Sequence, residues 1–401
     1  MSMMIGIVGK PNVGKSTFFN AATQAHAEVA NYPFTTIDAN QGVMYVRKPC
    51  PHSDFNVICT PHNSKCLNGT RYVPIEALDV AGLVPDAFKG RGLGNKFLDE
   101  LRQAHALIHI VDGSGGTDSE GNPVKRGSYN PLNDIDFLEK EITYWLKGII
   151  QKSWENIARK AQLEGIKVDR LLAEQLTGLG VNEAHIFSAI RSLQLNTDKP
   201  SAWTDEEILS LSDYIRRKSK PMIIAFNKVD IAEEEILATI EKIKKRGYRV
   251  IPTSAEAELA LSNASQQGLI EYTPGENRFI IKDPHSLTEK QHKALEYIQT
   301  KVLDVFGSTG VYRCIEESVS MLDLIVVYPV EDEHHLTDKE KRVLPDAFLI
   351  KNGSTAKDLA YKVHTDIGDH FIRAIDARTN RVIGADYKLK DGDVISIIAD
   401  S

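Results

Sequence analysis

The sequence predicts an α/β protein with a mainly parallel sheet, a helical insertion and a small C-terminal β-grasp unit. Three observations lead to this fold class. Short β-branched apolar runs alternate with helical patterns, as they do in sheets covered by helices on both faces. One segment, 117–205, breaks this alternation because it has helical periodicity and no strand pattern. The segment 321–401 then returns to short strands around one helix.

The composition is ordinary for a soluble globular protein. The chain has 401 residues, 42% hydrophobic and 26% charged, which excludes wholesale disorder and suggests two or three domains. The net charge of −7 argues against a surface that wraps DNA. No apolar run approaches the roughly 18 residues of a membrane span, and the N-terminus has no secretory pattern, so we expect a cytoplasmic protein with no membrane partner. The sequence leaves the oligomeric state open, and we favour a monomer.

The strands of the main sheet can be followed in chain order. Met4–Val8 is an apolar run that ends in glycine and predicts the first strand, and a helical stretch follows from Lys15 to Ala25. The later apolar runs are short, β-branched and followed by loops. They predict further strands at Ile75–Val80, Ala106–Asp112, Met222–Asn227 and Arg249–Ile251.

The remaining segments predict two more domains. After the polar loop Gly113–Asn130, apolar residues recur at helical spacing: Ile142, Leu146, Ile149, Ile150, Ile157 and Ala161. A helix over Thr288–Phe306 then leads to the β-grasp unit, whose predicted parts are strands at Leu324–Val327, Phe371-Ile372 and Val394–Ile398, a helix at Ala356–Val363 and a turn at Lys390–Asp393. The predicted domain bounds are 1–116 with 206–320, then 117–205, and 321–401.

A phosphate-binding motif follows the first strand. Gly9-Lys10-Pro11-Asn12-Val13-Gly14-Lys15-Ser16 fits the P-loop pattern, with a strand before it and a helix after it, as the motif requires. The glycines let backbone N–H groups face the phosphates, and the helix N-terminus adds its positive end. We expect Lys15 to reach the β/γ oxygens and Ser16 to bind Mg²⁺, and we include Thr17 among the nucleotide contacts. The main sheet is therefore predicted to be that of a P-loop NTPase.

Three motifs on later strands indicate a guanine nucleotide and a Ras-like G domain. Asp79-Val80-Ala81-Gly82 ends a strand where P-loop proteins place an Asp that holds Mg²⁺ through water and a Gly that contacts the γ-phosphate. In Asn227-Lys228-Val229-Asp230, the carboxylate can accept two hydrogen bonds from guanine that adenine cannot supply. Thr253-Ser254-Ala255 ends the next strand, and we expect backbone N–H groups of Ser254 and Ala255 at the guanine O6.

The residue expected to orient the attacking water is replaced in this chain. Leu83 follows D-x-x-G where Ras-like GTPases keep a glutamine, and an apolar side chain cannot hold water. Either intrinsic hydrolysis is slow, or another group supplies the positioning. Asn12 could coordinate a monovalent cation such as K⁺ as a substitute positive charge, and a loop-shaping role for Asn12 is an equal alternative.

Together these motifs resemble the Obg-like GTPases, and within them the YchF branch in its archaeal form. Asn31–Ile37 resembles the switch I of that family, and Gly90–Leu98, after Leu83, resembles its glycine-rich switch II. Val363–Asp366, Phe371–Ala374 and Lys390–Val394 resemble its ubiquitin-like TGS domain. The resemblance implies GTP, GDP and Mg²⁺ as ligands and the ribosome or ribosomal RNA as partner. In such a switch we expect Lys15 and Gly82 at the transferred phosphate, and Thr36, in preference to Thr35, on Mg²⁺.

Two departures limit what the resemblance implies. Bacterial and eukaryotic YchF proteins carry N-x-x-E and accept adenine, whereas Asn227–Asp230 is intact here. Those proteins are also thought to use a histidine from a mobile loop, and Gly113–Asn130 contains none, so we assign no catalytic histidine. The leading hypothesis is a ribosome-associated GTPase switch in translation. The alternatives are an ATP-accepting YchF-like ATPase, a small-molecule kinase, which would not need a guanine reader, and a nucleotide-regulated RNA- or ribosome-binding scaffold with little hydrolysis.

Metal-binding residue types gather between the predicted switch I and the D-x-x-G strand. They are Cys50, His52, Cys59, His62 and Cys66. Cys and His at such density can ligate zinc, but the spacing matches no standard finger. A disulfide and plain unpaired side chains are the alternatives. Of the three, zinc at Cys50, Cys59 and Cys66 is the one we favour least.

Overall fold

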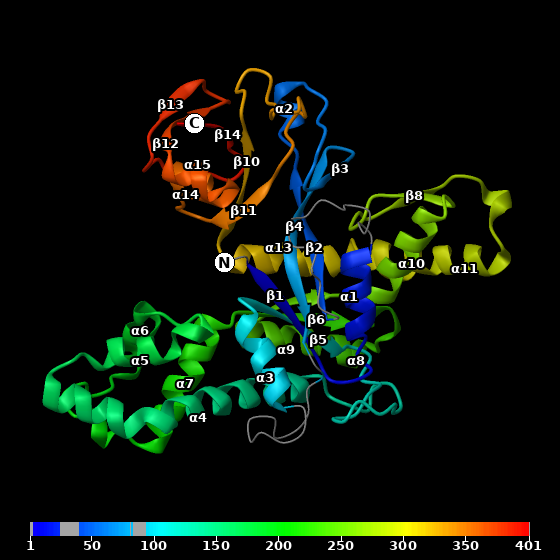
Figure 1. Cartoon of the computed structure of the whole chain (residues 1–401). Helices are drawn as coiled ribbons and strands as arrows, with labels where there is room; N and C mark the ends of the chain where they lie inside the picture. The colour runs from blue at the N-terminus through cyan, green and yellow to red at the C-terminus, as the bar shows by residue number, and fades with distance from the viewer. Residues whose placement is uncertain (1–2, 25–39, 81, 83–93, 401) are drawn as a thin grey trace. The chain divides into compact units, whose positions relative to one another are not determined.

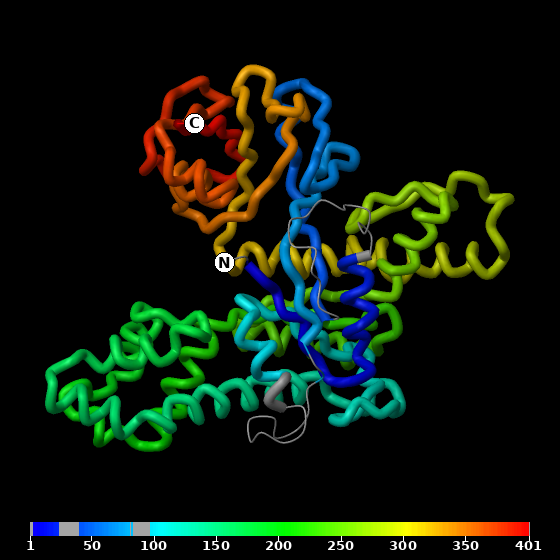
Figure 2. Tube along the Cα trace, viewed as in Figure 1, coloured from blue at the N-terminus to red at the C-terminus, as the bar shows by residue number. Residues whose placement is uncertain are grey.

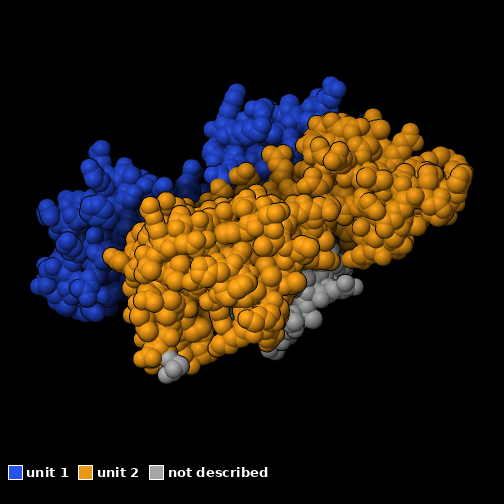
Figure 3. All heavy atoms as spheres, turned by 90° about the horizontal axis from the view of Figure 1, so that it is seen from above, with its two compact units in different colours: residues 1–19, 77–256 blue, residues 20–76, 257–401 orange. Residues whose placement is uncertain are grey.

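The computed structural model describes residues 3–24, 40–80, 82 and 94–400, and the side chains of 24 and 94–96 are outside that description. The chain forms two compact units, each built from two stretches of sequence (Figure 3). The first unit contains 1–19 and 77–256, and the second contains 20–76 and 257–401. Figure 2 follows the chain through both of them. None of the described helices is long and apolar enough to cross a bilayer.

The first unit is built on a sheet whose strands run in the order β4-β1-β5-β6-β7. The strands are β1 (Met4–Val8), the end of β4 (Thr70–Asp79), β5 (Ala106–Asp112), β6 (Met222–Asn227) and β7 (Arg249–Pro252). β1, β5, β6 and β7 pair in parallel, with Ile5 opposite Ala106, Leu107 opposite Met222 and Ile223 opposite Arg249. All residues of β5 and β6 are buried, as expected for strands of a covered parallel sheet. The predicted strands are confirmed.

The helices of the first unit cover this sheet and form the predicted insertion. α3 (Gly94–Gln103) packs on β1, α4 (Leu132–Glu164) on β5, and α9 (Thr239–Lys245) on β7. In the insertion α4 contacts α5 (Val168–Leu176) and α7 (Asp205–Ser219), and α6 (Glu183–Leu193) contacts both of those (Figure 1). The helix predicted from this periodicity is confirmed. The buried stripe of α4 is formed by Ile135, Leu138, Ile142, Leu146 and Ile150. α8 (Glu234–Leu237) lies between β6 and α9 in the chain.

The second unit contains strands that the sequence analysis did not predict. β2 (Gln41–Pro49) and β3 (Lys65–Leu67) both pair with β4, and the short helix α2 (His52–Phe55) lies between them in the chain. β8 (Ile270–Tyr272) and β9 (Phe279–Ile281) form a hairpin. α10 (Ala255–Gln266) and α11 (Glu289–Ile298) share a core with that hairpin, and a π-helical turn, Gln299–Leu303, joins α11 to α12 (Asp304–Phe306).

The C-terminal part of the second unit is the predicted β-grasp. After α13 (Val311–Met321), the sheet has the order β11-β10-β14-β12-β13. Its elements are β10 (Leu324–Val330), β11 (Phe348–Lys351), α14 (Ala356–Val363), α15 (Thr365–Asp369), β12 (Phe371–Asp376), β13 (Arg381–Ile383) and β14 (Val394–Ala399). Leu359 of α14 packs on Val327 and Ile395 in one apolar core. The two units group the chain by packing, so the three predicted domain bounds stay a prediction.

Candidate nucleotide-binding site

The predicted phosphate loop joins β1 to α1 (Lys15–Gln24). Gly14 has a φ of +95°, and a Cβ at this position would lie 2.3 Å from the Asn227 side-chain nitrogen. A Cβ on Gly9 would lie 2.8 Å from the carbonyl oxygen of Ile110. The loop backbone is therefore pressed against its neighbours at both glycines. α1 begins directly after the loop, and the first N–H groups of a helix have no intrahelical acceptor, so they suit an anion.

Lys15 and Asp79 meet beside the loop. The Lys15 ammonium forms an ion pair with the Asp79 carboxylate at the end of β4. Ser16 follows Lys15 and is exposed in the first turn of α1. Gly82 is partly buried, and a Cβ on it would lie 4.0 Å from Pro11 Cγ. An ammonium, a carboxylate and a hydroxyl around one loop form a donor set that fits phosphate oxygens and a hard cation such as Mg²⁺.

Asn227, the first residue of the predicted guanine motif, connects three segments of the site. Its Nδ2 donates to the carbonyl oxygen of Val13 at 2.8 Å, and its Oδ1 accepts from the backbone N–H of Ala255 at 3.0 Å. Asn227 and Ser254 are buried, and the Thr253 N–H donates to the carbonyl oxygen of Phe226 at 2.9 Å. The phosphate loop, the end of β6 and the turn after β7 are therefore held in one fixed arrangement.

Lys228 supports the same arrangement from a strained backbone position. Its φ is +62°, in the left-handed region, and the chain turns there into a 3₁₀ turn, Val229–Ile231, that carries the partly buried Asp230. The Lys228 ammonium donates to the carbonyl oxygen of Asn12 at 2.8 Å and to Asp112 Oδ2 at 2.9 Å. Lys228 therefore fixes the phosphate loop as well as the guanine motif.

Asp112 was not identified from the sequence, although it ends a predicted strand. Its carboxylate is 1% exposed and accepts from the Ser114 N–H and hydroxyl and from the Thr117 hydroxyl, in addition to Lys228. These bonds order the start of the loop Gly113–Asn130. Farther along, the Asn12 side-chain amide donates to the Gly121 carbonyl oxygen at 3.0 Å. This contact favours the loop-shaping interpretation of Asn12.

Lys10 has a different environment from the one its motif position suggests. Its ammonium is bound to the Asp134 carboxylate at 2.9–3.0 Å and to the Thr117 carbonyl oxygen at 3.1 Å, and it lies 3.9 Å from the centre of the Tyr129 ring. The Lys10 and Asp134 side chains are 5% and 8% exposed. The Lys10 ammonium is therefore already bound to protein groups. In this arrangement Lys10 can contact a nucleotide only through its main chain.

A cavity of about 360 Å³ lies beside this ion pair, and His109 of β5 is among its lining residues. His109 is 1% exposed, and among the described residues its Nδ1 has no hydrogen-bond partner. Burial, with a smaller effect of the Lys10 charge, lowers the pKa of His109 to about 3. The imidazole is therefore neutral. Sequence reasoning missed Asp134 and His109, because nothing near them in the chain indicates that Asp134 pairs with Lys10 or that His109 lines the same cavity as Lys10.

Two expected switch residues lie outside the described residues. Thr36, with Thr35 and the rest of Asn31–Ile37, belongs to the segment 25–39, and Leu83 belongs to 83–93. The Mg²⁺ role of Thr36 and the effect of Leu83 on hydrolysis therefore stay predictions from the sequence.

Four of the five residues in the Cys and His group come together in the second unit. The ligand atoms of Cys50, His52, Cys59 and Cys66 all lie within 4.8 Å of one another, and the cysteines are free thiols. His62 is not part of the group, because its Nδ1 lies 3.4 Å from Asp346 Oδ1.

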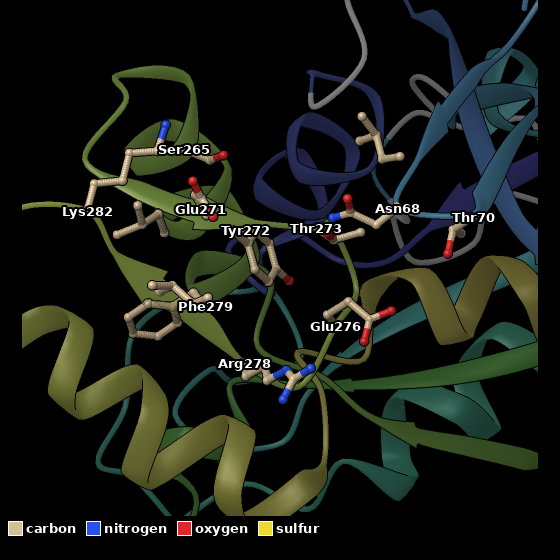
Figure 4. Close-up of a pocket in the computed structure, with 13 residues that line it drawn as sticks. Asn68, Thr70, Ser265, Glu271, Tyr272, Thr273, Glu276, Arg278, Phe279 and Lys282 are labelled. Carbon is tan, nitrogen blue, oxygen red and sulfur yellow. Dashed lines mark hydrogen bonds between the residues drawn. The ribbon is translucent and has the colours of Figure 1, made fainter. Parts of the chain in front are cut away.

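The second unit also has a pocket of about 670 Å³ between the β8–β9 hairpin and the β3–β4 turn (Figure 4). Its lining includes acidic and basic side chains, namely Glu271, Glu276, Arg278 and Lys282. None of the predicted nucleotide-site residues lines it. This mixture of charges does not specify a ligand, and we assign none.

Comparison with known proteins places these features in one family. A model described as 50S ribosome-binding GTPase matches residues 4–150, one described as Obg-like GTPase YGR210-like, G4 motif-containing domain, matches 225–332, and the TGS domain model matches 340–399. An uncharacterised GTP-binding protein of Methanocaldococcus jannaschii is 51% identical over 399 residues, with 99% of each chain covered. The ribosome-binding ATPase YchF of Buchnera aphidicola is 29% identical, again with 99% of each chain covered.

A solved structure supports the same assignment. The crystal structure of a GTP-binding protein from Pyrococcus horikoshii has a TM-score of 0.77 and 42% sequence identity, and it covers 99% of this chain and 100% of its own. The match therefore extends over nearly the whole of both chains. The chain belongs to the YchF-like branch of the Obg-like GTP-binding proteins, a family of P-loop NTPases with a C-terminal TGS domain.

Proposed function

We propose that this protein is a guanine-selective molecular switch that binds GTP and GDP with Mg²⁺, hydrolyses GTP slowly on its own and works on the ribosome during translation. The observation that carries the proposal is the double hydrogen bonding of Asn227, which ties the start of the intact N-K-x-D motif to both the phosphate loop and the turn at Ala255. Because Asn227 holds the guanine motif and the phosphate loop together, the site is suited to bind a nucleotide in a single pose.

Guanine selectivity follows from the chemistry of Asp230. A carboxylate at this position accepts hydrogen bonds from the N1–H and the amino group of guanine, whereas adenine presents no such pair of donors. Binding adenine would desolvate the carboxylate without giving these bonds in return, which is costly. The relatives named as ATPases align over nearly the whole chain at only 27–29% identity, and we attribute guanine selectivity in this chain to Asp230.

The triphosphate end of the site relies on Lys15, Ser16 and Asp79. When nucleotide and Mg²⁺ bind, we expect the Lys15–Asp79 ion pair to separate, so that the ammonium faces the β/γ oxygens and the carboxylate faces the cation through water. Mg²⁺ held by Ser16, Thr36 and Asp79 would offset the charge on the phosphates. Gly82 would donate its backbone N–H to the γ-phosphate. None of these groups orients water, which is why we expect slow turnover.

The ribosomal partner is inferred from relatives. YchF of Buchnera aphidicola is named a ribosome-binding ATPase, and the first family model is named after binding to the 50S ribosome. The helical insertion of this chain presents exposed basic side chains at Lys152, Arg159, Lys167 and Arg170, which could face RNA phosphates. Acidic residues lie nearby, so the charge pattern also fits an ordinary solvent-exposed helix face. We therefore infer the ribosomal partner from the family and not from this charge pattern.

Single-turnover hydrolysis of GTP by the full chain, with and without ribosomes, tests the proposal. We expect slow basal hydrolysis that ribosomes accelerate, because an added water-orienting or charged group is worth about 10³–10⁵-fold in GTPases that lack one. Leu83→Ala should leave the basal rate nearly unchanged. A basal rate on the order of 1 s⁻¹ in Na⁺ buffer would contradict the slow switch.

The same experiment separates the alternatives. No hydrolysis with or without ribosomes, combined with nucleotide-dependent ribosome binding, would favour the scaffold. Faster turnover of ATP than of GTP would favour a YchF-like ATPase. Acceleration by K⁺ relative to Na⁺, lost in Asn12→Ala, would show that Asn12 is a cation ligand in spite of its contact with Gly121.

A further inference from the structure

The second unit contains a cluster of soft metal-ligating atoms outside the nucleotide motifs. The distance between the Cys50 and Cys59 sulfur atoms is 3.9 Å, and His52 Nδ1 lies 3.4 Å from Cys59 Sγ and 3.5 Å from Cys66 Sγ. All four ligand atoms fall within 4.8 Å of one another. Three sulfurs and one imidazole nitrogen therefore lie close enough together to share one ion.

The three distances within this cluster can be compared with those of a tetrahedral zinc site. With Zn–S near 2.3 Å and Zn–N near 2.0–2.1 Å, ideal tetrahedral geometry places neighbouring sulfurs about 3.8 Å apart and sulfur and nitrogen about 3.5 Å apart. The observed distances of 3.9, 3.4 and 3.5 Å agree with these values. A disulfide needs an S–S distance of about 2.05 Å, and 3.9 Å does not meet it.

Local backbone structure places each of the four Cys and His side chains in the cluster. Asn68 and Gly69, with φ of +48° and +82°, form the two-residue turn between β3 and β4, as an Asn-Gly pair does in hairpins. Cys50 is fastened to this turn because its N–H donates to the Gly69 carbonyl oxygen at 2.8 Å. Cys66 lies on β3 directly opposite Arg71, and His52 begins α2. Four ligands from a strand end, a helix, a loop and a hairpin thus converge without a standard finger spacing.

We propose that Cys50, His52, Cys59 and Cys66 bind one structural Zn²⁺. Four protein ligands fill a tetrahedral shell and leave no open position for water, so the site stabilises structure rather than catalysing a reaction. On binding, the three thiols release their protons and Zn²⁺ takes their place.

The surroundings of the cluster fit an anionic site. Arg71 is fully buried, and among the described residues it forms no ion pair with a carboxylate and its Nε has no acceptor. One of its terminal nitrogens lies 3.9 Å from Cys50 Sγ, and the other donates to the Leu344 and Pro345 carbonyl oxygens. Three thiolates and one Zn²⁺ carry one net negative charge, which compensates the buried guanidinium.

The zinc would fix a segment that docks on the chain before β11. The Thr60 N–H donates to the Val343 carbonyl oxygen at 2.9 Å, and the His62 N–H donates to that of Pro345 at 2.7 Å. Asn63 exchanges two hydrogen bonds of 3.0 Å with the backbone of Ala347. Because these contacts lie between Cys59 and Cys66, holding the two cysteines on one ion presets the loop for docking.

Metal content of the full-length protein, purified without chelators or added metal, tests the proposal. We expect about one zinc per chain by elemental analysis, with reactivity of Cys50, Cys59 and Cys66 toward a thiol reagent appearing only after a chelator removes the metal. Cobalt exchanged into the protein should give the intense visible bands of a tetrahedral thiolate site, and this readout needs no variant. The thermal unfolding temperature should fall when the metal is removed and recover when zinc returns.

Matched variants locate the site. Cys59→Ser and His52→Gln should lose zinc, whereas Cys314→Ser and His62→Gln should keep it, since Cys314 lies in α13 and His62 faces Asp346. Zinc-free protein with three reactive thiols would overturn the proposal. So would a zinc-free chain about 2 Da lighter than expected, which would mean a disulfide. Since the ligands are not nucleotide-site residues, zinc loss with intact GTP binding, or the reverse, distinguishes this proposal from the proposed function.

Discussion

Replacing Gly14 by alanine should break the link between the phosphate loop and the guanine motif. The new Cβ would lie 2.3 Å from Asn227 Nδ2, far inside van der Waals contact, so the amide must move. Moving it loses the bonds to Val13 and Ala255, at about 1 kcal/mol each. A φ of +95° adds roughly 1–2 kcal/mol for a residue with a Cβ. The total is about 3–4 kcal/mol.

This total should divide between folding and binding. One part of it destabilises the nucleotide-free folded state. We expect the free energy of unfolding, measured by denaturant titration, to fall by that part. The remainder should weaken binding of a fluorescent GDP analogue, by tenfold for each 1.4 kcal/mol. The sum of the two losses should be about 3–4 kcal/mol.

Two further glycines serve as controls for this variant. Gly165 has a φ of +65° and no atom within 4 Å of its Cβ position, so Gly165→Ala has backbone strain without a clash and should cost about 1–2 kcal/mol of stability and no affinity. Gly148 lies inside α4 with open space around it, and Gly148→Ala should stabilise by about 1 kcal/mol. If Gly14→Ala costs no more than Gly165→Ala in total, the coupling through Asn227 is refuted.

Three more predictions follow from the same site. Lys15→Ala should abolish tight triphosphate binding and turnover while the fold survives, as titration and circular dichroism would show, whereas Lys152→Ala on the exposed face of α4 should change neither. Lys10→Met should lower the free energy of unfolding by about 3–5 kcal/mol, because it leaves the Asp134 carboxylate buried without its partner. The double variant Lys10→Met with Asp134→Leu should recover much of this loss. Equal stability of the single and double variants would contradict the prediction. Burial holds the pKa of His109 at about 3, below its unfolded value near 6.5, so between these pH values the folded state binds fewer protons than the unfolded state. The free energy of unfolding should therefore fall by about 1.4 kcal/mol per pH unit as the pH drops below 6.5. His109→Leu should remove this part of the pH dependence.

The nucleotide motifs could be located from the sequence because each is local. Gly9–Ser16 is a contiguous pattern between a strand and a helix, and Asn227–Asp230 follows an apolar run whose six residues are all buried. Parallel strands place their carboxyl ends at one edge of a sheet, so the order of the motifs already predicted their meeting. The structure adds the hydrogen bonds that hold them.

The rest of the site depends on contacts that are distant in the chain. Lys10 and Asp134 are 124 positions apart, and a single Asp near the start of a long helix does not indicate its partner. Cys50, His52, Cys59 and Cys66 were grouped by density, but their spacing did not separate zinc from a disulfide. The Asn68-Gly69 pair was the usable signal, since a two-residue hairpin there brings Cys66 back to Cys50.

β2 was missed for a related reason. Val43–Val46 is a short apolar run inside a polar segment, and periodicity alone does not identify a run of that length as a strand. Its burial comes from α13, which packs on it from far along the chain.

We expect Asp230 to make this member of the family a guanine-nucleotide switch. Isothermal titration of the full-length protein with GDP and with ADP, in the same Mg²⁺ buffer, tests it most directly. We expect GDP to bind at least about tenfold more tightly than ADP, a difference of at least about 1.4 kcal/mol, and Asp230→Glu to reduce this preference. Equal affinities, or tighter binding of ADP by the unaltered protein, would contradict it.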